Sequence, residues 1–267
     1  MNKIEREMFS LLKELQESYG AVGLKAEFEA EGTRVEELLR LLELGHRGGM
    51  KMALKIGGCE AVRDLIEAKQ FGVNFIIAPM VETAYAVSKF IEAKNKVFTP
   101  DERAEVDFLF NIETKTGFDN LNGMLEAASI EDGCDGIVFG RVDFVGSKNM
   151  ARDFVDSAEV TSVAKLVGSG CKRSNLDLVV GGGVSNNAIP ALNEIKSVHL
   201  TRFETRKVIF DESALSIHGF ERGLLLAVHF ELLWLLNKRE FYRAITDEDN
   251  KRIEMLEKRW KVLSEKY

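Results

Sequence analysis

The sequence predicts a closed (β/α)₈ barrel, a TIM barrel, with additional C-terminal helices; an open doubly wound sheet is the second possibility. Short apolar segments alternate with helix-length segments from residue 21 to 210, the pattern of parallel strands joined by crossover helices. The chain has 267 residues, close to the roughly 250 that such a barrel needs. No repeat, low-complexity tract or linker divides it, so we expect a single domain over residues 1–267.

Six strands are indicated by their length, their apolar content and the turn residues that follow them. They cover 21–29, 51–56, 74–82, 106–113, 136–140 and 176–180. The β-rich, charged range 197–210 supplies a seventh strand, and also the eighth if it contains a bend. Pro79 should end the third strand, because proline cannot donate to a central ladder.

Apolar residues at helical spacing predict an N-terminal helix within 1–20 and a helix between successive strands. Two further helices are predicted at the end of the chain, over 213–240 and 246–266. The first of these is apolar on more than one side, which is typical of a deeply buried helix or one shared between subunits. We therefore expect the range 213–267 to contain a homo-oligomer interface.

Composition limits the classes of partner. The net charge is −7, from 36 Lys and Arg against 43 Asp and Glu, which argues against a nucleic-acid partner. The cysteines are odd in number and far apart (Cys59, Cys134 and Cys171), as expected for free thiols in a reducing compartment. With no signal-peptide pattern and no apolar run near the roughly 20 residues of a membrane span, we expect a cytoplasmic protein with no membrane partner.

Charged residues occupy one face of the first strand and the end of the second. Lys25, Glu27 and Glu29 alternate with apolar residues, and Lys55 precedes a diglycine. In a barrel these charges point into the mouth, whereas in an open arrangement the same face is solvated. Lys25, Glu27 and Lys55 are also consistent with an ion-pair network that has no role in chemistry.

Two later strands each end in a carboxylate. Glu113 closes the fourth strand, and Asp143 follows the fifth strand just after Arg141. Parallel strands emerge on one face of a barrel or sheet, so we expect Glu113 and Asp143 to converge. Two converging carboxylates predict a binding site for a hard divalent cation. Arg141 either contacts substrate, positions Asp143 or caps a helix.

A run of three glycines, Gly181, Gly182 and Gly183, follows the sixth strand. Such a run leaves backbone N–H groups free to bind an anion. The alternative is a tight turn that needs positive φ angles.

Together these segments resemble the HpcH/HpaI aldolase and citrate lyase β-subunit family of phosphoenolpyruvate/pyruvate-binding TIM barrels. The resemblance is strongest over residues 50–147. Its motifs are Pro79-Met-Val-Glu, Asn111-Ile-Glu113-Thr with Gly117, and Asp135-Gly-Ile-Val-Phe-Gly140-Arg-Val-Asp143-Phe.

The resemblance implies that Glu113 and Asp143 bind Mg²⁺ or Mn²⁺. It also implies that an arginine at a strand end binds the substrate carboxylate. This chain has Lys55 at that position, and lysine offers a point charge where arginine offers a planar, bidentate donor. The acidic-histidine element of the aldolase branch is matched by Glu27 and Glu29 but by no histidine. The identity of the base, and with it the substrate, stays open.

The expected activity is that of a class II carbon–carbon lyase acting on a small 2-oxo acid or an acyl-CoA-like substrate. A divalent metal would stabilise the enolate left by bond cleavage. We expect Lys55 or Arg141 to bind the substrate carboxylate, and the triglycine to bind a second anionic end. We expect Glu27 or Glu29, with a raised pKa, to transfer the proton. The alternatives are a Schiff-base aldolase using Lys55 and a barrel that binds a metabolite without turnover.

Overall fold

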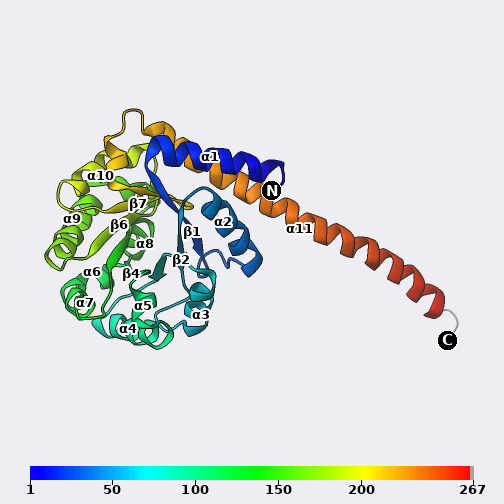
Figure 1. The fold of residues 1–267 in the computed structure, drawn as a ribbon, viewed down its shortest axis with the longest axis horizontal. Coiled ribbons are helices and arrows are strands. Elements are labelled where there is room, and N and C mark those ends of the chain that lie inside the picture. Colours follow the sequence, from blue (N-terminus) through cyan, green and yellow to red (C-terminus); the bar gives the residue numbers. More distant parts are fainter. Residues whose placement is uncertain (265–267) are drawn as a thin grey trace.

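The computed structural model describes the backbone of residues 1–264 and the side chains of residues 1–261. Eight strands close into one barrel in the order β1 to β8, which confirms the predicted fold (Figure 1). Their bounds are β1 Ala21–Glu27, β2 Lys51–Lys55, β3 Phe75–Ala78, β4 Asp107–Ile112, β5 Gly136–Gly140, β6 Asp177–Gly181, β7 Arg202–Glu204 and β8 Val208–Asp211.

The last strand differs from the prediction of an all-parallel barrel. Strands β1 to β7 pair in parallel, whereas β8 is antiparallel to both β7 and β1. The reason is the short connection: only Thr205, Arg206 and Lys207 separate β7 from β8, and a parallel return needs a crossover of a dozen or more residues. The hairpin turn therefore lies at the same end of the barrel as the C-terminal ends of β1 to β7.

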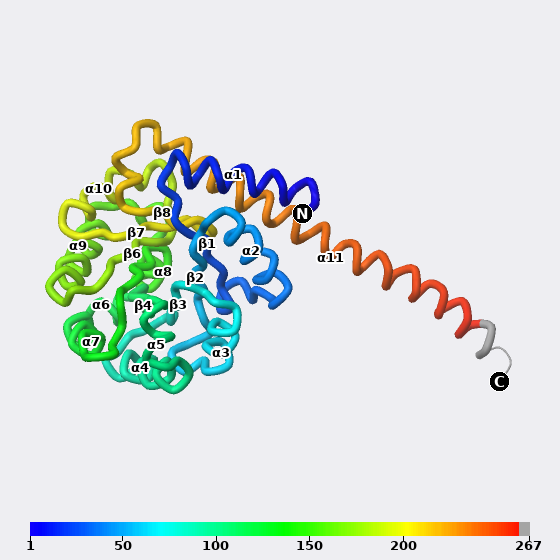
Figure 2. Tube along the Cα trace, viewed as in Figure 1, coloured from blue at the N-terminus to red at the C-terminus, as the bar shows by residue number. Residues whose placement is uncertain are grey.

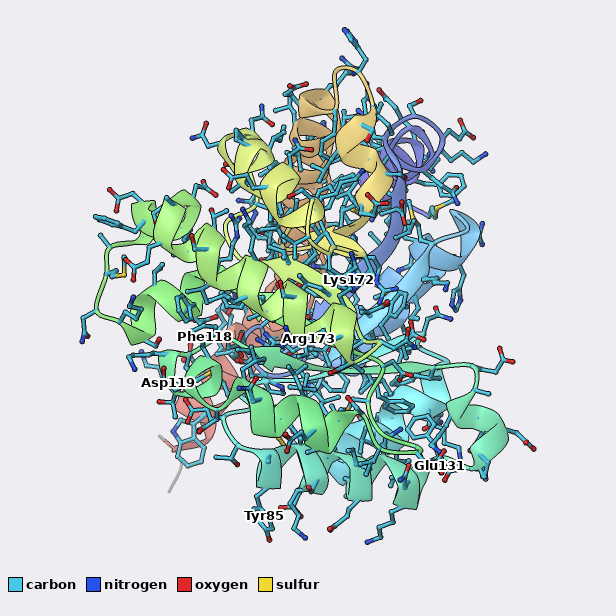
Figure 3. All side chains as sticks on the ribbon, turned by 90° about the vertical axis from the view of Figure 1, so that its left-hand side faces the viewer. Tyr85, Phe118, Asp119, Glu131, Lys172 and Arg173 are labelled. Atoms are coloured by element: carbon cyan, nitrogen blue, oxygen red, sulfur yellow. The ribbon has the colours of Figure 1, made fainter. Side chains whose placement is uncertain are left out.

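A ring of helices surrounds the barrel (Figures 1 and 3). On this ring the exposed side chain of Tyr85 points outward. The helices before the last one are α1 Lys3–Tyr19, α2 Val35–Arg47, α3 Val62–Phe71, α4 Ala84–Val97, α5 Pro100–Arg103, α6 Lys115–Asp119, α7 Leu121–Ala128, α8 Arg141–Ser147, α9 Ala158–Arg173 and α10 Ile189–Lys196, with 3₁₀ turns η1 Arg152–Asp156, η2 Asn186–Ala188 and η3 Glu212–Ser216.

The C-terminal region forms one long helix, α11 Glu221–Ser264, in place of the two helices predicted there (Figure 2). No glycine or proline interrupts the chain between residues 240 and 246, so the helix continues. The end of the predicted second helix, residues 265–266, lies outside the described residues. Helix α11 runs beside α1, with Asn2 Nδ2 2.7 Å from Asn237 Oδ1, and then projects beyond the barrel (Figure 2).

Strand alternation separates two packing regions. One face of the strands packs against the helices as the main core. The other face fills the barrel interior with a small apolar cluster, which consists of Ala53, Phe75, Ile77, Leu109, Val138, Val179 and Ile209. Lys25 and Glu27 are 7% and 4% exposed, so the charged face of β1 points inward and is not solvated.

No helix in the described part of the chain is both long enough and apolar enough to cross a membrane.

Candidate active site

A cavity of about 700 Å³ opens at the C-terminal ends of the barrel strands. Its walls come from strands across the barrel, from the β7–β8 turn and from α11. The structure brings all but one of the predicted site residues to this cavity, namely Glu27, Glu29, Lys55, Glu113, Asp143, Gly181, Gly182 and Gly183. The exception is Arg141.

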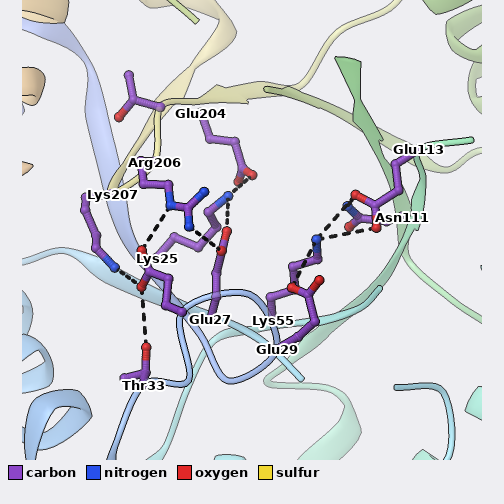
Figure 4. A network of polar contacts seen from close by, with 12 residues as sticks. Lys25, Glu27, Glu29, Thr33, Lys55, Asn111, Glu113, Glu204, Arg206 and Lys207 are labelled. Atoms are coloured by element: carbon purple, nitrogen blue, oxygen red, sulfur yellow. Dashed lines mark hydrogen bonds and ion pairs between the residues drawn. The ribbon is translucent and has the colours of Figure 1, made fainter. Parts of the chain in front are cut away.

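One wall of the cavity carries a network of ion pairs centred on Lys25 (Figure 4). Its ammonium lies 2.5 Å from Glu204 and 3.1 Å from Glu27, and Arg206 contacts Glu27 at 3.6 Å. Burial by itself would lower the pKa of Lys25, but the charges of Glu204 and Glu27 outweigh it and hold that pKa above its usual range. Arg206 also pairs with Glu31 at 3.1 Å.

The pKa of Glu27 corrects one prediction. Burial opposes the shift, but the charges of Lys25 and Arg206 lower the pKa of Glu27 below its usual range. A carboxylate in this environment stays ionised and is a weak base, so Glu27 lacks the raised pKa that we expected of a proton acceptor. Of the two candidates, Glu29 is left; within the described residues it forms one ion pair, with Lys55 at 3.5 Å.

Glu113 sits at the end of β4 and is held by three donors (Figure 4). Lys55 Nζ lies 3.4 and 3.3 Å from its two carboxylate oxygens, and Asn111 Nδ2 donates to Oε2 at 2.6 Å. The backbone N–H of Met80 donates to Oε1 at 2.9 Å. Met80 has φ of 52°, which is uncommon for a residue other than glycine and indicates local strain beside this carboxylate.

A glycine makes room for this arrangement. A Cβ atom on Gly140, the last residue of β5, would lie 2.8 Å from both Cβ and Oε2 of Glu113. Any larger residue there would displace the Glu113 carboxylate from the cavity. The glycine before Arg141 in the sequence motif is therefore needed for packing against Glu113.

Asp143 lies in the first turn of α8, directly after β5, and faces the same cavity. Within the described residues its carboxylate forms no hydrogen bond or ion pair. Burial and the charge of Glu113 raise the pKa of Asp143. The negative charge of Glu113 repels that of Asp143, and Asp143 has no partner in the described part of the chain that offsets this repulsion. A bound cation would offset it.

The oxygen donors present fit a hard divalent cation. Besides Glu113 and Asp143, Asn111 presents a buried Oδ1 atom that has no hydrogen-bond partner among the described residues. The described residues contain no cluster of three or more His, Cys, Asp or Glu side chains placed for a metal, so the protein would supply two carboxylates and one amide. Lys55 contacts Glu113, and its ammonium would compete with a cation for that carboxylate.

Arg141 does not line the cavity, so the structure does not support direct contact with substrate. The residue is 1% exposed; its Nη1 lies 2.7 Å from Asp156 Oδ1, and its Nε donates to the carbonyl of Gly181 at 3.3 Å. Arg141 thereby ties the start of α8 to the end of β6 and to η1. Its role in these contacts is positional.

The triglycine is divided between a strand and a turn. Gly181 belongs to β6 and pairs with Gly140, whereas Gly182 and Gly183 have φ of 80° and 67°. Both conformations favour glycine, as the tight-turn alternative requires. The N–H groups of Gly182 and Gly183 donate no hydrogen bond within the described residues, so they are also free for an anion.

Sequence reasoning missed several cavity residues. Glu204 and Arg206 belong to the range 197–210, whose charged pattern did not reveal a hairpin. Arg152 lies in a 3₁₀ turn without periodicity, so no sequence pattern marked it. The only sequence signal for these residues was the presence of Arg and Lys within a short β-rich range.

Comparisons with known proteins identify a family and agree with the fold. The family model described as HpcH/HpaI aldolase/citrate lyase matches residues 30–187. No functionally curated protein matches the chain.

Three solved structures illustrate the similarity. An HpcH/HpaI aldolase from Desulfitobacterium hafniense DCB-2 is 13% identical, with 72% of this chain and 78% of that chain covered and a TM-score of 0.56. An HpcH/HpaI aldolase/citrate lyase family protein from Burkholderia cenocepacia J2315 is 12% identical, with 89% and 98% covered and a TM-score of 0.59. The citrate synthase SbnG is 16% identical, with 74% and 81% covered and a TM-score of 0.58. At these identities the likeness shows the fold.

Proposed function

The chain belongs to the HpcH/HpaI aldolase/citrate lyase family, and from that premise we propose that it is a divalent-metal-dependent carbon–carbon lyase acting on a small 2-oxo acid or an acyl-CoA-type substrate. Members of this family are typically metal-dependent and bind small oxo acids. The observation that carries the proposal is Asp143, which lines the same cavity as Glu113, has a raised pKa and has no partner within the described residues.

Glu113, Asp143 and the free Oδ1 of Asn111 would hold the cation, Mg²⁺ or Mn²⁺. Bound there, it would act as a Lewis acid that stabilises developing enolate charge. The cavity favours such an added charge, because seven carboxylates and five cationic side chains line it. An anionic substrate entering this cavity alone would meet an excess of negative charge.

The chain's own residues would handle the rest of the reaction. Lys55, at the edge of the same site, would neutralise the substrate carboxylate. Glu29 would take the proton from the substrate hydroxyl when the carbon–carbon bond breaks, and return it in the reverse direction. Its side chain is 30% exposed, so it has access both to the cavity and to water.

The Schiff-base alternative requires Lys55 as a free amine. In the structure Lys55 forms ion pairs with Glu113 and Glu29, at 3.3 and 3.5 Å, which is a setting for an ammonium group. Borohydride reduction in the presence of pyruvate would label Lys55 if that mechanism operated. A barrel without turnover would instead bind oxo acids and convert none of a panel of them.

Thermal unfolding with Mg²⁺ or Mn²⁺, with and without oxalate, tests the metal site. Oxalate resembles the pyruvate enolate in its two chelating oxygens. We expect metal and oxalate together to raise the melting temperature of the wild type by several degrees and to leave Glu113→Gln unchanged, because ligand bound only to the folded state stabilises it.

Glu131→Gln is the matched control, since Glu131 is exposed on the outer surface (Figure 3). It should respond like the wild type. An equal shift in Glu113→Gln, or no shift in the wild type, would refute the proposed metal site.

A homo-oligomer through the C-terminal helix stays a prediction. Helix α11 buries one side against the barrel and α1, and exposes an apolar stripe on the other. The stripe consists of Leu225, Val228, Leu232 and Leu235, which are 65%, 56%, 52% and 53% exposed. A second copy of the chain would cover such a stripe, and a mass measurement in solution that gave only monomer would contradict this.

A further inference from the structure

One cationic side chain in the cavity has no counterpart. Five cationic side chains line the cavity, and four of them form ion pairs: Lys25, Lys55, Arg206 and Lys238. Arg152 is the fifth, and within the described residues no carboxylate lies within 4.0 Å of it. An exposed guanidinium that lines a cavity and lacks a partner is available to a ligand.

Free backbone donors lie on the same wall. Gly182 and Gly183 line the cavity, and their N–H groups have no acceptor within the described residues. Two successive residues with positive φ can turn their N–H groups toward an anion. Arg152 adds a full positive charge and a guanidinium group that can donate two hydrogen bonds to one carboxylate.

The chain holds these two elements together. Arg152 is the first residue of η1, and η1 packs on the glycine turn: a Cβ atom on Gly183 would lie 3.3 Å from Val155 Cγ2. The buried Arg141 links Asp156, at the end of η1, to the carbonyl of Gly181. The position of Arg152 beside the glycine turn therefore depends on buried contacts and not on an exposed loop alone.

We infer that Arg152 and the N–H groups of Gly182 and Gly183 form a second anion-binding site, which takes the distal carboxylate of a dicarboxylic 2-oxo acid. This inference rests on the proposed function, because it assumes that the reacting end of the substrate binds at Glu113 and Asp143. Asp143 follows β5 and the glycine turn follows β6, and these two strands are neighbours. Neighbouring strands are about 5 Å apart, a distance that a five-carbon dicarboxylate spans.

Calorimetric binding of two ligands of equal length tests the inference. 2-Oxoglutarate has a distal carboxylate where 2-oxopentanoate has a methyl group. With Mg²⁺ present, we expect the wild type to bind 2-oxoglutarate about tenfold more tightly, the effect of one charge-assisted contact. Arg152→Met should remove this preference without changing the affinity for 2-oxopentanoate, and Arg152→Lys should keep part of it.

Arg63→Met is the matched control, since Arg63 is exposed, does not line the cavity and, among the described residues, pairs with Glu67 alone. It should keep the full preference. Absence of a preference in the wild type, a preference that persists in Arg152→Met, or an equal loss of both ligands would overturn the inference.

Oxalate distinguishes this inference from the proposed function. If metal and oxalate stabilise the wild type but 2-oxoglutarate is not preferred, the second anion site is wrong and the metal site stands. If 2-oxoglutarate is preferred through Arg152 but oxalate has no effect, the anion site stands and the metal-dependent lyase is wrong.

Discussion

The two walls of the cavity differ in how their charges are paired. On the wall formed by β1, β2 and the β7–β8 turn, each cation contacts a carboxylate: Lys25 with Glu204 and Glu27, and Lys55 with Glu113 and Glu29 (Figure 4). The wall formed by the ends of β5 and β6 carries few charges, yet Asp143 and Arg152 there have no partner within the described residues.

The difference separates stability from binding. Lys25, buried between Glu204 and Glu27, holds the strands in register and has no contact left for a ligand. A charge left without a partner reduces stability, and a ligand can supply the missing interaction. The Lys25 network therefore indicates a structural role, whereas Asp143 and Arg152 on the second wall are available to a cation and a substrate.

The largest effect is expected on the paired wall. Lys25→Met should lower the free energy of unfolding by about 3 kcal/mol, because it removes the cation that contacts the buried Glu204 and leaves the buried Glu27 with Arg206 as its one ion-pair partner among the described residues. Urea unfolding at pH 7 measures the loss. As a control, Lys148→Met removes a partly exposed pair with Glu159 and a cation–π contact with the Phe144 ring, and should cost about 1 kcal/mol or less. Equal losses in the two variants would remove the contrast between the walls.

A smaller effect of opposite sign is expected on the unpaired wall. The pKa of Asp143 is raised by burial and by Glu113, so the folded protein favours the protonated carboxyl group. That stabilising preference is fully present below about pH 4 and is lost as the pH rises through the pKa in the folded state. At pH 7 the ionised carboxylate is therefore a cost, and Asp143→Asn should remove it.

Without divalent metal, Asp143→Asn should stabilise the protein at pH 7 by about 0.5 kcal/mol; the value is small because the carboxylate, although partly desolvated, still has enough contact with water for its charge to be screened. The gain should shrink toward zero at pH 4. Urea unfolding of the wild type and the variant at both pH values measures it. A variant less stable than the wild type at pH 7 would show that Asp143 has a structural partner.

The smallest effect is expected for Arg152. Because this side chain is exposed and has no partner in the described residues, Arg152→Met should change the free energy of unfolding by less than about 0.5 kcal/mol. Urea unfolding measures it on the protein used for ligand binding. A loss comparable with that of Lys25→Met would assign Arg152 to the structural network and not to ligand binding.

Much of the fold and part of the site were predictable from residue patterns. Pro79 directly follows β3, and Glu113 directly follows β4, because strand ends are marked by local sequence. The period-2 pattern of β1 left two environments open for Lys25 and Glu27, and only barrel closure placed them inside. The direction of β8 was missed because the short range 197–210 contains two strands and a turn, and no residue pattern marks where the turn lies.

Roles within the site were less predictable than positions. The sequence identified Glu27 as a candidate base and Arg141 as a candidate substrate contact, and both residue types suit those roles. Contacts with residues far away in the chain changed both assignments: Arg206 helps to lower the pKa of Glu27, and Asp156 pairs with a buried Arg141. Arg152 became visible as a candidate only because its neighbours in space could be counted.

By itself, the sequence determined the barrel, the family motifs and the placement of Glu113 and Asp143 at neighbouring strand ends, because periodicity and strand order are local or topological properties. Only the tertiary structure decided which charges are paired, which carboxylate has a lowered pKa and which cavity arginine has no ion-pair partner within the described residues. The physical reason is that electrostatic pairing depends on distances of a few ångströms between residues distant in sequence, such as Lys25 and Glu204.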